Sequence, residues 1–442
     1  MKKILCTILA LSMIFALVAA CGPADPPAPV EVAPADPAPA DPAPADDPAD
    51  DSADDPGDAP PPVAEVATTE PTWFEINAEL PGRIAIITNT IDQNEEEFRS
   101  AEALVRKYGA QNVIHRTWPV RFAEEAEMMI TIMSDLARDS RVEAIIINQA
   151  VVNTNAAIDA ARAIREEMGQ DIFIVSASAA EVPADVSLRV DLALDINNPG
   201  IGRPFVEQAH AMGAETIIHY SFPRHMAIPM LAARRDAMAA TAEELGINFV
   251  EVAAPDPMEE GGMPATQLFI SQDAPRQIAE HGPDTVLFAT NCGMQIPLLA
   301  AALEYEAMYV QPCCPSPFHA FPTALGLSAD QSEALINFTV QEITDATIEE
   351  VARRGLTGRF SNIIMPAPMV WTTVGFMYAV EWLNGNAPQE VGVVDMDLVH
   401  RLTGDYAYTL FGERKYFTWQ ELEIDGVSFP LMLVGNSPYI TY

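Results

Sequence analysis

Short apolar runs alternate with amphipathic stretches along the first part of the folded chain. Between the runs, apolar residues recur at spacings of three and four, as they do through residues 122–138, and this is the period of an α-helix. The runs themselves have no polar face, and strands of that kind separated by helices form a parallel sheet covered on both sides. The expected strands are 83–88, 112–118, 142–148 and 171–176, and the expected helices are 95–108, 122–138 and 153–168.

The same alternation restarts near residue 188. A single sheet would need too many strands to hold both series, so the pattern predicts an α/β fold with two doubly wound parallel-sheet lobes. The expected strands of the second series are 188–194, 216–220, 248–252, 285–290 and 308–311.

These patterns also suggest where the lobes begin and end. We expect lobe one to span residues 82–197 and lobe two to span residues 198–327. Residues 328–442 should supply crossover helices and a C-terminal cover shared between the lobes, with long helices at about 329–354 and 366–384. The end of the chain from Asp395 is rich in Tyr, Phe and Trp, which predicts strands or irregular cover.

Residues 1–20 have the pattern of a signal peptide. Lys2 and Lys3 precede an apolar run that is too short to span a membrane, and small residues then lead to Cys21. The run Leu-Val-Ala-Ala before Cys21 resembles the bacterial lipobox, which implies cleavage before this cysteine and lipid attachment to its thiol. Cleavage as an ordinary secretory peptide, with Cys21 incidental, is the alternative. We expect an acylated, palmitate-type lipoprotein at the cell membrane that faces outside the cytoplasm, because two or three acyl chains anchor a protein stably.

Residues 21–70 consist largely of Pro, Ala and Asp and contain no basic residue. This segment has almost no large apolar side chains to bury, so it cannot offset the entropy lost on ordering. Proline stiffens such a segment and like charges extend it. We therefore expect a disordered tether between the anchor and the folded body.

The charge balance excludes several classes of partner. The 442 residues carry a formal charge of −39, from 24 Lys and Arg against 63 Asp and Glu. Binding of nucleic acid needs a basic face, and so does a polybasic contact with anionic lipid heads. The body stays acidic when the tether is set aside, which disfavours long-range attraction of anions and favours a neutral or cationic solute.

A lipid anchor, a tether and two successive doubly wound lobes together resemble the type I periplasmic-binding-protein superfamily. The resemblance is strongest to the basic-membrane-protein lipoproteins and to a related uncharacterised bacterial lipoprotein family. Residues 84–98 resemble the first strand and its acidic, Phe-containing loop, residues 186–202 the first crossover, and residues 284–293 a cleft-lining strand and turn of lobe two. The resemblance covers about 82–385 and implies a solute held between two lobes. The Gly-Gly that often follows the first strand in that group is missing here, so only Phe98 carries over from its nucleoside-contacting residues, in a stacking role.

Polar side chains follow many of the predicted strands. Ligands of open α/β sheets bind beyond the carboxyl ends of the strands, and in two facing lobes these ends line one cleft. Amides and hydroxyls there suit a neutral polar ligand, although many such residues serve only as helix caps. We expect Asn89, Asn148 and Asn291 to face the shared cleft. The full set of candidate ligand-binding residues is Asn89, Asp92, Phe98, Asn148, Gln149, Ser176, Tyr220, Asn291, Gln295 and Gln311.

Three cysteines remain in the folded body: Cys292, Cys313 and Cys314. Outside the cytosol a disulfide from Cys292 to Cys313 or Cys314 is one interpretation, and inert buried thiols are the other. The three cysteines and His319 have the ligand types of a metal site, but their spacing matches no metal motif. We therefore predict neither a metal nor a cofactor.

The chain has no phosphate loop, zinc-protease helix, nucleophile elbow or paired-carboxylate pattern, and we expect no enzyme. The sequence predicts a lipid-anchored solute-binding protein of an ABC-type importer. Its partners would be a small nucleoside-like or sugar-like solute, the membrane and an ABC permease. A membrane-tethered sensor or scaffold that presents the same fold to a partner protein is the alternative, and the oligomeric state stays open.

Overall fold

The computed structural model describes residues 71–327, 340–414 and 417–442. They belong to one compact unit that runs from Thr68 to Tyr442. The expected signal peptide, the tether and the acylation site at Cys21 lie outside the described residues. Among the residues described, no helix combines the length and the apolar composition needed to cross a membrane.

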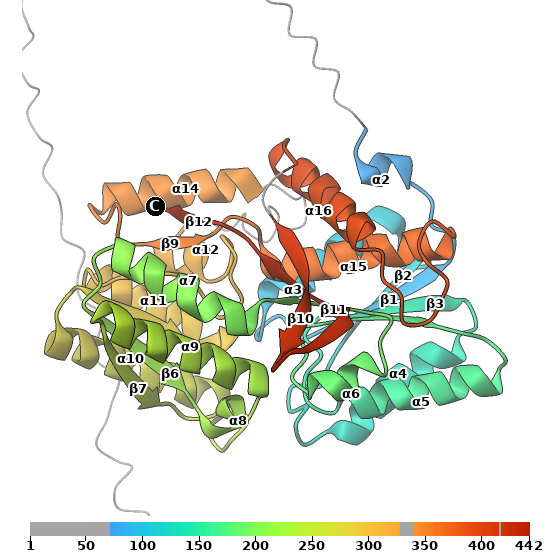
Figure 1. Ribbon diagram of the computed structural model, residues 1–442, viewed down its shortest axis with the longest axis horizontal. Coiled ribbons are helices and arrows are strands. Elements are labelled where there is room, and N and C mark those ends of the chain that lie inside the picture. Colours follow the sequence, from blue (N-terminus) through green and yellow to red (C-terminus); the bar gives the residue numbers. More distant parts are fainter. Residues whose placement is uncertain (1–70, 328–339, 415–416) are drawn as a thin grey trace, which may run out of the picture. The chain divides into compact units, whose positions relative to one another are not determined.

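Lobe one is built on a seven-stranded sheet (Figure 1) with the strand order β10-β11-β5-β4-β3-β1-β2. All neighbouring strands pair in parallel except β10 and β11, which are antiparallel. The strand predicted at 188–194 lies a few residues later, because a short helix and a turn come before it. The strands are β1 (Arg83–Thr88), β2 (Val113–Thr117), β3 (Val142–Ile147), β4 (Phe173–Ala177), β5 (Leu192–Ile196), β10 (Thr418–Ile424) and β11 (Val427–Asn436).

Alternate residues of these strands face two different helical layers. Ile84 and Ile86 belong to a core cluster shared with α3 and α15, whereas Ala85 and Ile87 belong to one shared with α4 and α5. Both faces of the strand are therefore apolar, as the unbroken apolar run predicted. The helices of this lobe are α2 (Trp73–Ile76), α3 (Glu95–Tyr108), α4 (Ala126–Arg138), α5 (Thr154–Glu167), α6 (Pro183–Ser187), α15 (Ala367–Leu383) and α16 (Met396–Phe411).

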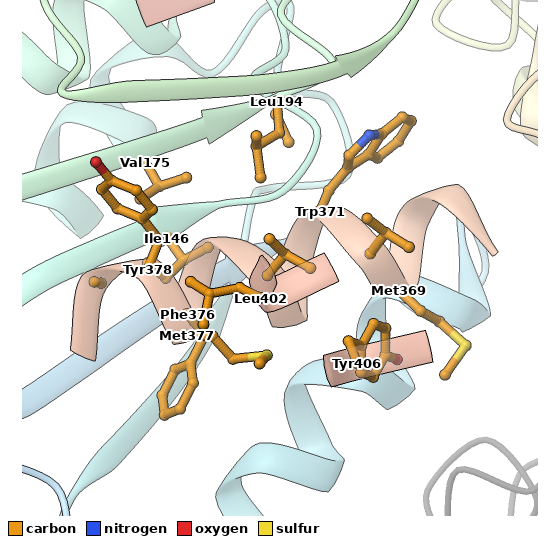
Figure 2. Packing of buried hydrophobic residues seen from close by; sticks show 14 of the residues in the cluster. Ile146, Val175, Leu194, Met369, Trp371, Phe376, Met377, Tyr378, Leu402 and Tyr406 are labelled. Carbon is orange, nitrogen blue, oxygen red and sulfur yellow. The ribbon is translucent and has the colours of Figure 1, made fainter. Parts of the chain in front are cut away.

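Helix α15 is surrounded by protein on all sides. Every residue from Ala367 to Glu381 is buried. Figure 2 shows the helix between Ile146 and Val175 of the sheet and Leu402 of α16. A helix that is apolar all round has no face that favours water, so it lies in the interior.

Lobe two contains a smaller parallel sheet with the order β7-β6-β8. Isolated bridges of Met308 and Tyr309 replace the strand predicted at 308–311. Helices α7 and α9 contribute to one core cluster of this sheet, and α10 and α11 contribute to the other. The elements are α7 (Asn198–Ala211), β6 (Thr216–Ser221), α8 (Pro223–Met226), α9 (Pro229–Leu245), β7 (Asn248–Ala253), α10 (Gly262–His281), β8 (Thr285–Ala289), η1 (Cys292–Met294), α11 (Gln295–Glu304), α12 (Phe321–Leu325), α14 (Val340–Arg353), β9 (Ser361–Ile363) and β12 (Tyr439–Thr441).

The C-terminal segment completes both lobes. Strands β10 and β11 extend the sheet of lobe one, and β12 pairs antiparallel with β9. The prediction of strands or irregular cover from Asp395 onward was wrong for its first part, because this part forms helix α16. The side chain of Asp395 accepts a hydrogen bond from the N–H of Leu398, and Gly412 ends the helix at φ 69°. Asp395 and Gly412 are typical capping residues and were present in the sequence, but the high content of Tyr, Phe and Trp favoured strands. The broader prediction of an α/β fold with two doubly wound parallel-sheet lobes is confirmed.

Helices α7 and α9 touch at Gly202. A Cβ atom at this position would lie 2.7 Å from the carbonyl oxygen of Arg234 and 2.8 Å from Cβ of Ala237. The nearest atom belongs to the backbone of α9, so no change of rotamer can relieve the clash. Close contact between these helices therefore requires glycine at position 202.

We expect the substitution Gly202→Ala to lower the free energy of unfolding by roughly 1–3 kcal/mol, the usual cost of overpacking. The matched control is Gly404→Ala in α16, where the nearest neighbours of a new Cβ are side-chain atoms of Arg414 at 3.7 Å. That control should keep or raise stability by up to about 1 kcal/mol, because alanine favours a helix. Urea unfolding followed by circular dichroism measures both, and equal effects of the two substitutions would contradict the prediction.

Candidate functional site

A cavity of about 430 Å³ opens at the carboxyl ends of strands from both lobes. Lobe one contributes Asn89 after β1, Gln149 after β3 and Ser178 after β4. Lobe two contributes Thr290 and Asn291 after β8, together with residues of α8 and α9. Strand ends that are distant in sequence therefore line one cavity, as expected for parallel sheets.

Two residues on the lobe-one wall have an unusual backbone. Gln149 has φ 55° and Ser178 has φ 48°, and neither is glycine. Such left-handed residues cost roughly 1–2 kcal/mol each and persist only where the surroundings hold them. Two backbone hydrogen bonds hold these loops in place. Ala150 N–H donates to Ala177 O at 2.7 Å, and Ala180 N–H donates to Ala150 O at 2.9 Å. The two loops after β3 and β4 thus brace one another at the edge of the cavity.

Asn89 presents a side-chain oxygen that has no partner among the described residues, although the residue is 6% exposed. Its backbone N–H donates to Oε1 of Glu97 at 2.5 Å. Burial raises the pKa of Glu97 and of the neighbouring Glu96, whose Oε1 accepts a bond from Ser316. The start of α3 therefore fixes the backbone at Asn89 and leaves its amide oxygen available.

On the lobe-two wall, Thr290 connects two elements. Its Oγ1 lies 2.8 Å from Oγ of Ser221 and 3.0 Å from Nδ1 of His225. Burial lowers the pKa of His225 to about 3, so its imidazole is neutral at physiological pH. Asn291 accepts a bond from the N–H of Gly293 at 2.9 Å and thereby caps the 3₁₀ turn that follows.

Two ionisable side chains of the cavity wall, Arg224 and Asp195, contribute little net charge to it. Arg224 forms two bonds of 2.8 Å to the carboxylate of Asp256. Burial raises the pKa of Asp195 to about 8, and this outweighs the bonds that Asp195 accepts from Ile196 N–H and from Asn198. The Asp195 side chain is therefore mainly neutral at pH 7.

Three free thiols also lie on the cavity wall. Sγ of Cys292 is 3.3 Å from Sγ of Cys313 and 3.5 Å from Sγ of Cys314. A disulfide bond is about 2.05 Å long, and all three cysteines are free. The pKa of Cys292 is raised, first because its thiol donates toward Cys313. The three sulfurs therefore lie close together, as a disulfide from Cys292 to Cys313 or Cys314 would require, but the structure contains all three as thiols.

Among the predicted ligand-binding residues, Asn89, Gln149 and Asn291 line the cavity. Asn148 is fully buried, and its Nδ2 donates to Pro368 O at 2.9 Å and to Thr372. It therefore anchors α15 to the sheet and does not line the cavity, contrary to the expected trio of asparagines. Ser176 is likewise fully buried and away from the cavity wall.

Two further candidates in lobe two bind other parts of the fold. The hydroxyl of Tyr220 donates to Asp273 at 3.1 Å. Gln295 donates to the carbonyls of Ala289 and Asn291, and its Oε1 accepts a bond from Tyr309 at 2.6 Å. The hydrogen-bonding groups of both side chains are thus used within lobe two.

The last three candidates also lie outside the cavity lining. Oε1 of Gln311 accepts a bond of 2.6 Å from Tyr439. Asp92 is exposed on a turn. Phe98 packs edge-on against His115 with ring centroids 4.7 Å apart, so the stacking partner that the structure gives it is a side chain of its own lobe.

Several cavity residues come from helices or, in the case of Gln93, from the turn before α3, and were not selected by the strand-end rule. They are Gln93, Arg224, His225, Arg234 and Trp371. Trp371 lies on the buried helix α15 (Figure 2). In the sequence it is one of many apolar residues in that helix, so no local signal distinguishes it from the core. Only the position of α15 beneath the strand ends brings it to the cavity.

The raised pKa of Asp195 predicts a pH-dependent stability. The unfolded carboxyl group ionises near pH 4, whereas the folded one keeps its proton up to about pH 8. Between these values the folded state binds more protons, so this group's contribution to stability is complete below about pH 4 and is lost as the pH rises toward 8. Asp195→Asn stays neutral and keeps an oxygen for the bonds from Ile196 and Asn198. We expect the variant to gain more than about 1 kcal/mol of stability relative to wild type between pH 4.5 and pH 8.

Urea unfolding at several pH values measures this difference. The control is Asp135→Asn, at an exposed position on α4. The difference in the free energy of unfolding between this variant and wild type should change little over the same pH range. A difference between Asp195→Asn and wild type that stays constant with pH would show that Asp195 is ionised in the folded protein.

Comparison with known proteins gives one family and several structural relatives. The profile of the family described as Protein of unknown function (DUF3798) matches residues 83–361. An uncharacterized protein of Treponema pallidum (strain Nichols) is 28% identical over 225 residues, which cover 50% of this chain and 99% of that protein. A second uncharacterized protein of the same organism is 27% identical over 180 residues, covering 39% of this chain and 80% of that protein.

Among solved structures, a candidate transcriptional regulator of Clostridium difficile 630 matches with a TM-score of 0.63 and 21% identity, over 82% of this chain and 99% of that chain. An ABC transporter periplasmic solute-binding protein of Actinobacillus succinogenes 130z, with bound D-allose, matches with a TM-score of 0.46 and 13% identity, over 71% of this chain and 96% of that chain. At these identities the likeness concerns the fold alone, and the TM-score of 0.63 shows that this chain shares the fold of the Clostridium difficile protein. The family profile covers more than half of the chain and holds every cavity residue except Trp371, so the chain belongs to the DUF3798 family.

Proposed function

We propose that this protein is an extracytoplasmic solute-binding protein, anchored by lipid at Cys21, that delivers a small polar solute to an ABC-type importer. The observation that carries the proposal is the cavity of about 430 Å³ to which both lobes contribute. Sites for small molecules occupy such clefts and have volumes of about 300–1,000 Å³. A monosaccharide or a nucleoside is of a size that this volume accommodates.

The connections between the lobes support this proposal. In the described part of the chain, the backbone passes between the lobes at three places: from β5 to α7, from β9 to α15, and from β11 to β12. The three connections touch one another. Asn197 N–H donates to Gly435 O at 3.1 Å, and Ile364 N–H donates to Pro438 O at 3.3 Å. Short adjacent connections of this kind allow two lobes to bend toward a ligand without coming apart.

The lining also indicates a class of solute. Apolar side chains form much of the wall, and polar groups at the strand ends can fix the orientation of a ligand. The paired charges of Arg224 and Asp256 and the neutral Asp195 leave little reason for an ionic ligand at this part of the wall. A neutral solute with a ring face and several hydroxyl or amide groups is the best fit. The apolar lining residues include Val151, Val152, Ile228, Leu231, Met258, Met263 and Trp371.

A thermal-shift screen of the full-length protein tests the proposal. A specific solute raises the melting temperature by mass action, because it binds only the folded state. Nucleosides, sugars, amino acids and cofactor vitamins at millimolar concentration form the panel. The absence of a shift with every member would refute the proposal of a solute importer.

For the solute found, we expect Asn89→Ala to weaken binding by about 1–3 kcal/mol, because it removes a buried oxygen available for a hydrogen bond. The control is Asn248→Ala at the exposed start of β7, which should leave affinity unchanged. Asn148→Ala should instead lower the melting temperature, because Asn148 bonds to α15. Calorimetric titration measures the affinities. An Asn89→Ala variant that binds as tightly as wild type would remove this residue from the proposed site.

Lipid attachment has its own test. We expect Cys21→Ala to release the protein from the membrane or to leave its signal uncleaved, because no thiol remains to accept the lipid. Membrane fractionation and mass determination of the N-terminus distinguish the processed forms. A variant that is cleaved at another site and still fractionates with the membrane would contradict the anchor.

A further inference from the structure

A cluster of three sulfurs and one imidazole lies at the wall of the cavity, and the solute-binding proposal does not use it. Cys292 belongs to the turn after β8, and Cys313 and Cys314 lie in the segment before α12. The side-chain ligand atoms of Cys292, Cys313 and His319 all lie within 4.8 Å of one another. Sγ of Cys314 is 3.5 Å from Sγ of Cys292. Three donors of the soft and borderline type therefore lie close enough together to share one ion, and the sulfur of Cys314 lies beside them.

Two side-chain amides donate hydrogen bonds to these sulfurs. Nδ2 of Asn94 donates to Sγ of Cys292 at 3.8 Å, and Nε2 of Gln149 donates to Sγ of Cys314 at 3.5 Å. Both amides come from lobe one and reach across to the cysteines. N–H donors directed at sulfur stabilise a negatively charged sulfur, and they are typical of the shell around metal-bound thiolates.

A buried positive charge lies next to the same cluster. Arg234 is 2% exposed, and its Nη1 donates to Cys313 O at 3.2 Å and to Asn198 Oδ1 at 3.0 Å. Its Nε and Nη2 have no hydrogen-bond partner within the described residues, and the nearby carboxyl group of Asp195 is mainly neutral because burial raises its pKa to about 8. A buried cation is costly unless negative charge lies close to it. Thiolates in the cluster would supply that charge.

The imidazole of His319 is oriented by backbone carbonyls. Nδ1 lies 3.2 Å from Cys314 O, and Nε2 lies 3.5 Å from Cys292 O. A neutral imidazole carries one N–H, and the shorter contact assigns it to Nδ1, which donates to Cys314 O. Nε2 then carries the lone pair, and a metal ion bound there would replace its 3.5 Å contact with Cys292 O. A metal-binding histidine shows this arrangement, in which the other ring nitrogen donates to a carbonyl.

We propose that Cys292, Cys313, Cys314 and His319 bind one thiophilic d¹⁰ metal ion of the zinc class. Three sulfurs and one imidazole nitrogen make a tetrahedral Cys₃His set, which is a known closed zinc environment. With Zn–S distances of about 2.3 Å, sulfurs in such a tetrahedron lie about 3.8 Å apart. The observed separations of 3.3 and 3.5 Å need to grow by only a few tenths of an ångström.

The charges and protons of the proposed site balance. Binding of Zn²⁺ by three thiols releases three protons to water and leaves three thiolates. Their three negative charges are offset by the two charges of the ion and the one charge of Arg234. The ion would join the turn after β8 to the segment before α12, and so fix the wall that faces Gln149. This inference does not depend on the identity of the solute or on its binding.

The test uses full-length protein, purified in detergent under reducing conditions and stripped with a chelator. Zn²⁺ is added alone, and bound metal is counted by elemental analysis after gel filtration. Co²⁺ replaces Zn²⁺ in a second sample, because cobalt bound to thiolate gives a near-ultraviolet charge-transfer band. We expect one Zn²⁺ per chain and a cobalt spectrum with this band. Both measurements use the wild-type fold, so they do not depend on whether a variant folds.

The variants are His319→Gln and Cys313→Ser, and the matched control is His210→Gln on the exposed face of α7. We expect the first two to weaken Zn²⁺ binding at least about tenfold and the control to bind like wild type. Folded, reduced wild type that binds no Zn²⁺, or that gives a cobalt complex without the sulfur band, would overturn the proposal. So would unchanged affinity in His319→Gln, or a disulfide between Cys292 and Cys313 or Cys314 in protein isolated from membranes without a reductant.

Discussion

The three backbone connections between the lobes are the constraint on which the rest of the structure depends. They lie against each other and exchange backbone hydrogen bonds, such as Asn197 N–H to Gly435 O and Ile364 N–H to Pro438 O. Because each connection is short and held by its neighbours, the carboxyl ends of both sheets stay at the same side of the connections. The cavity exists there for that reason. The C-terminal strands make the arrangement possible, since β11 pairs with β5 of lobe one and β12 pairs with β9 of lobe two.

Burial decides the ionisation of several groups in and near the cavity. Glu96, Glu97 and Asp195 all have pKa values raised by desolvation, whereas burial lowers the pKa of His225. Each of these groups therefore tends toward its neutral form, which a low-dielectric interior favours. An acidic protein thus presents a cavity wall with little net negative charge. Arg234, a buried cation of the cavity wall, lies next to the sulfur cluster, and negative charge in this cluster would compensate it.

The two proposals describe neighbouring parts of one wall. The polar strand ends would hold an uncharged solute, while the cysteines and His319 would hold an ion that fixes the segment next to it. Gln149 takes part in both, because its backbone shapes the edge of the cavity and its amide donates to Cys314. A metal site at this place would make the shape of the cavity depend on the ion as well as on the hinge.

The sequence by itself determined the class of the fold and the order of its elements. Unbroken apolar runs such as Ile84–Ile87 required a sheet covered on both faces, and helical periodicity located the covering helices within a few residues. It also brought Asn89, Gln149 and Asn291 to the right edge, because every parallel strand ends there. The tertiary structure alone decided which strand-end residues face the cavity: Asn148 turns toward α15, and that helix lies far away in the sequence. It alone also united Cys292 with Cys313 and His319, and placed Arg234 and Trp371 at the wall. These positions depend on how helices and loops pack across the lobes, and local periodicity carries no information about contacts of that range.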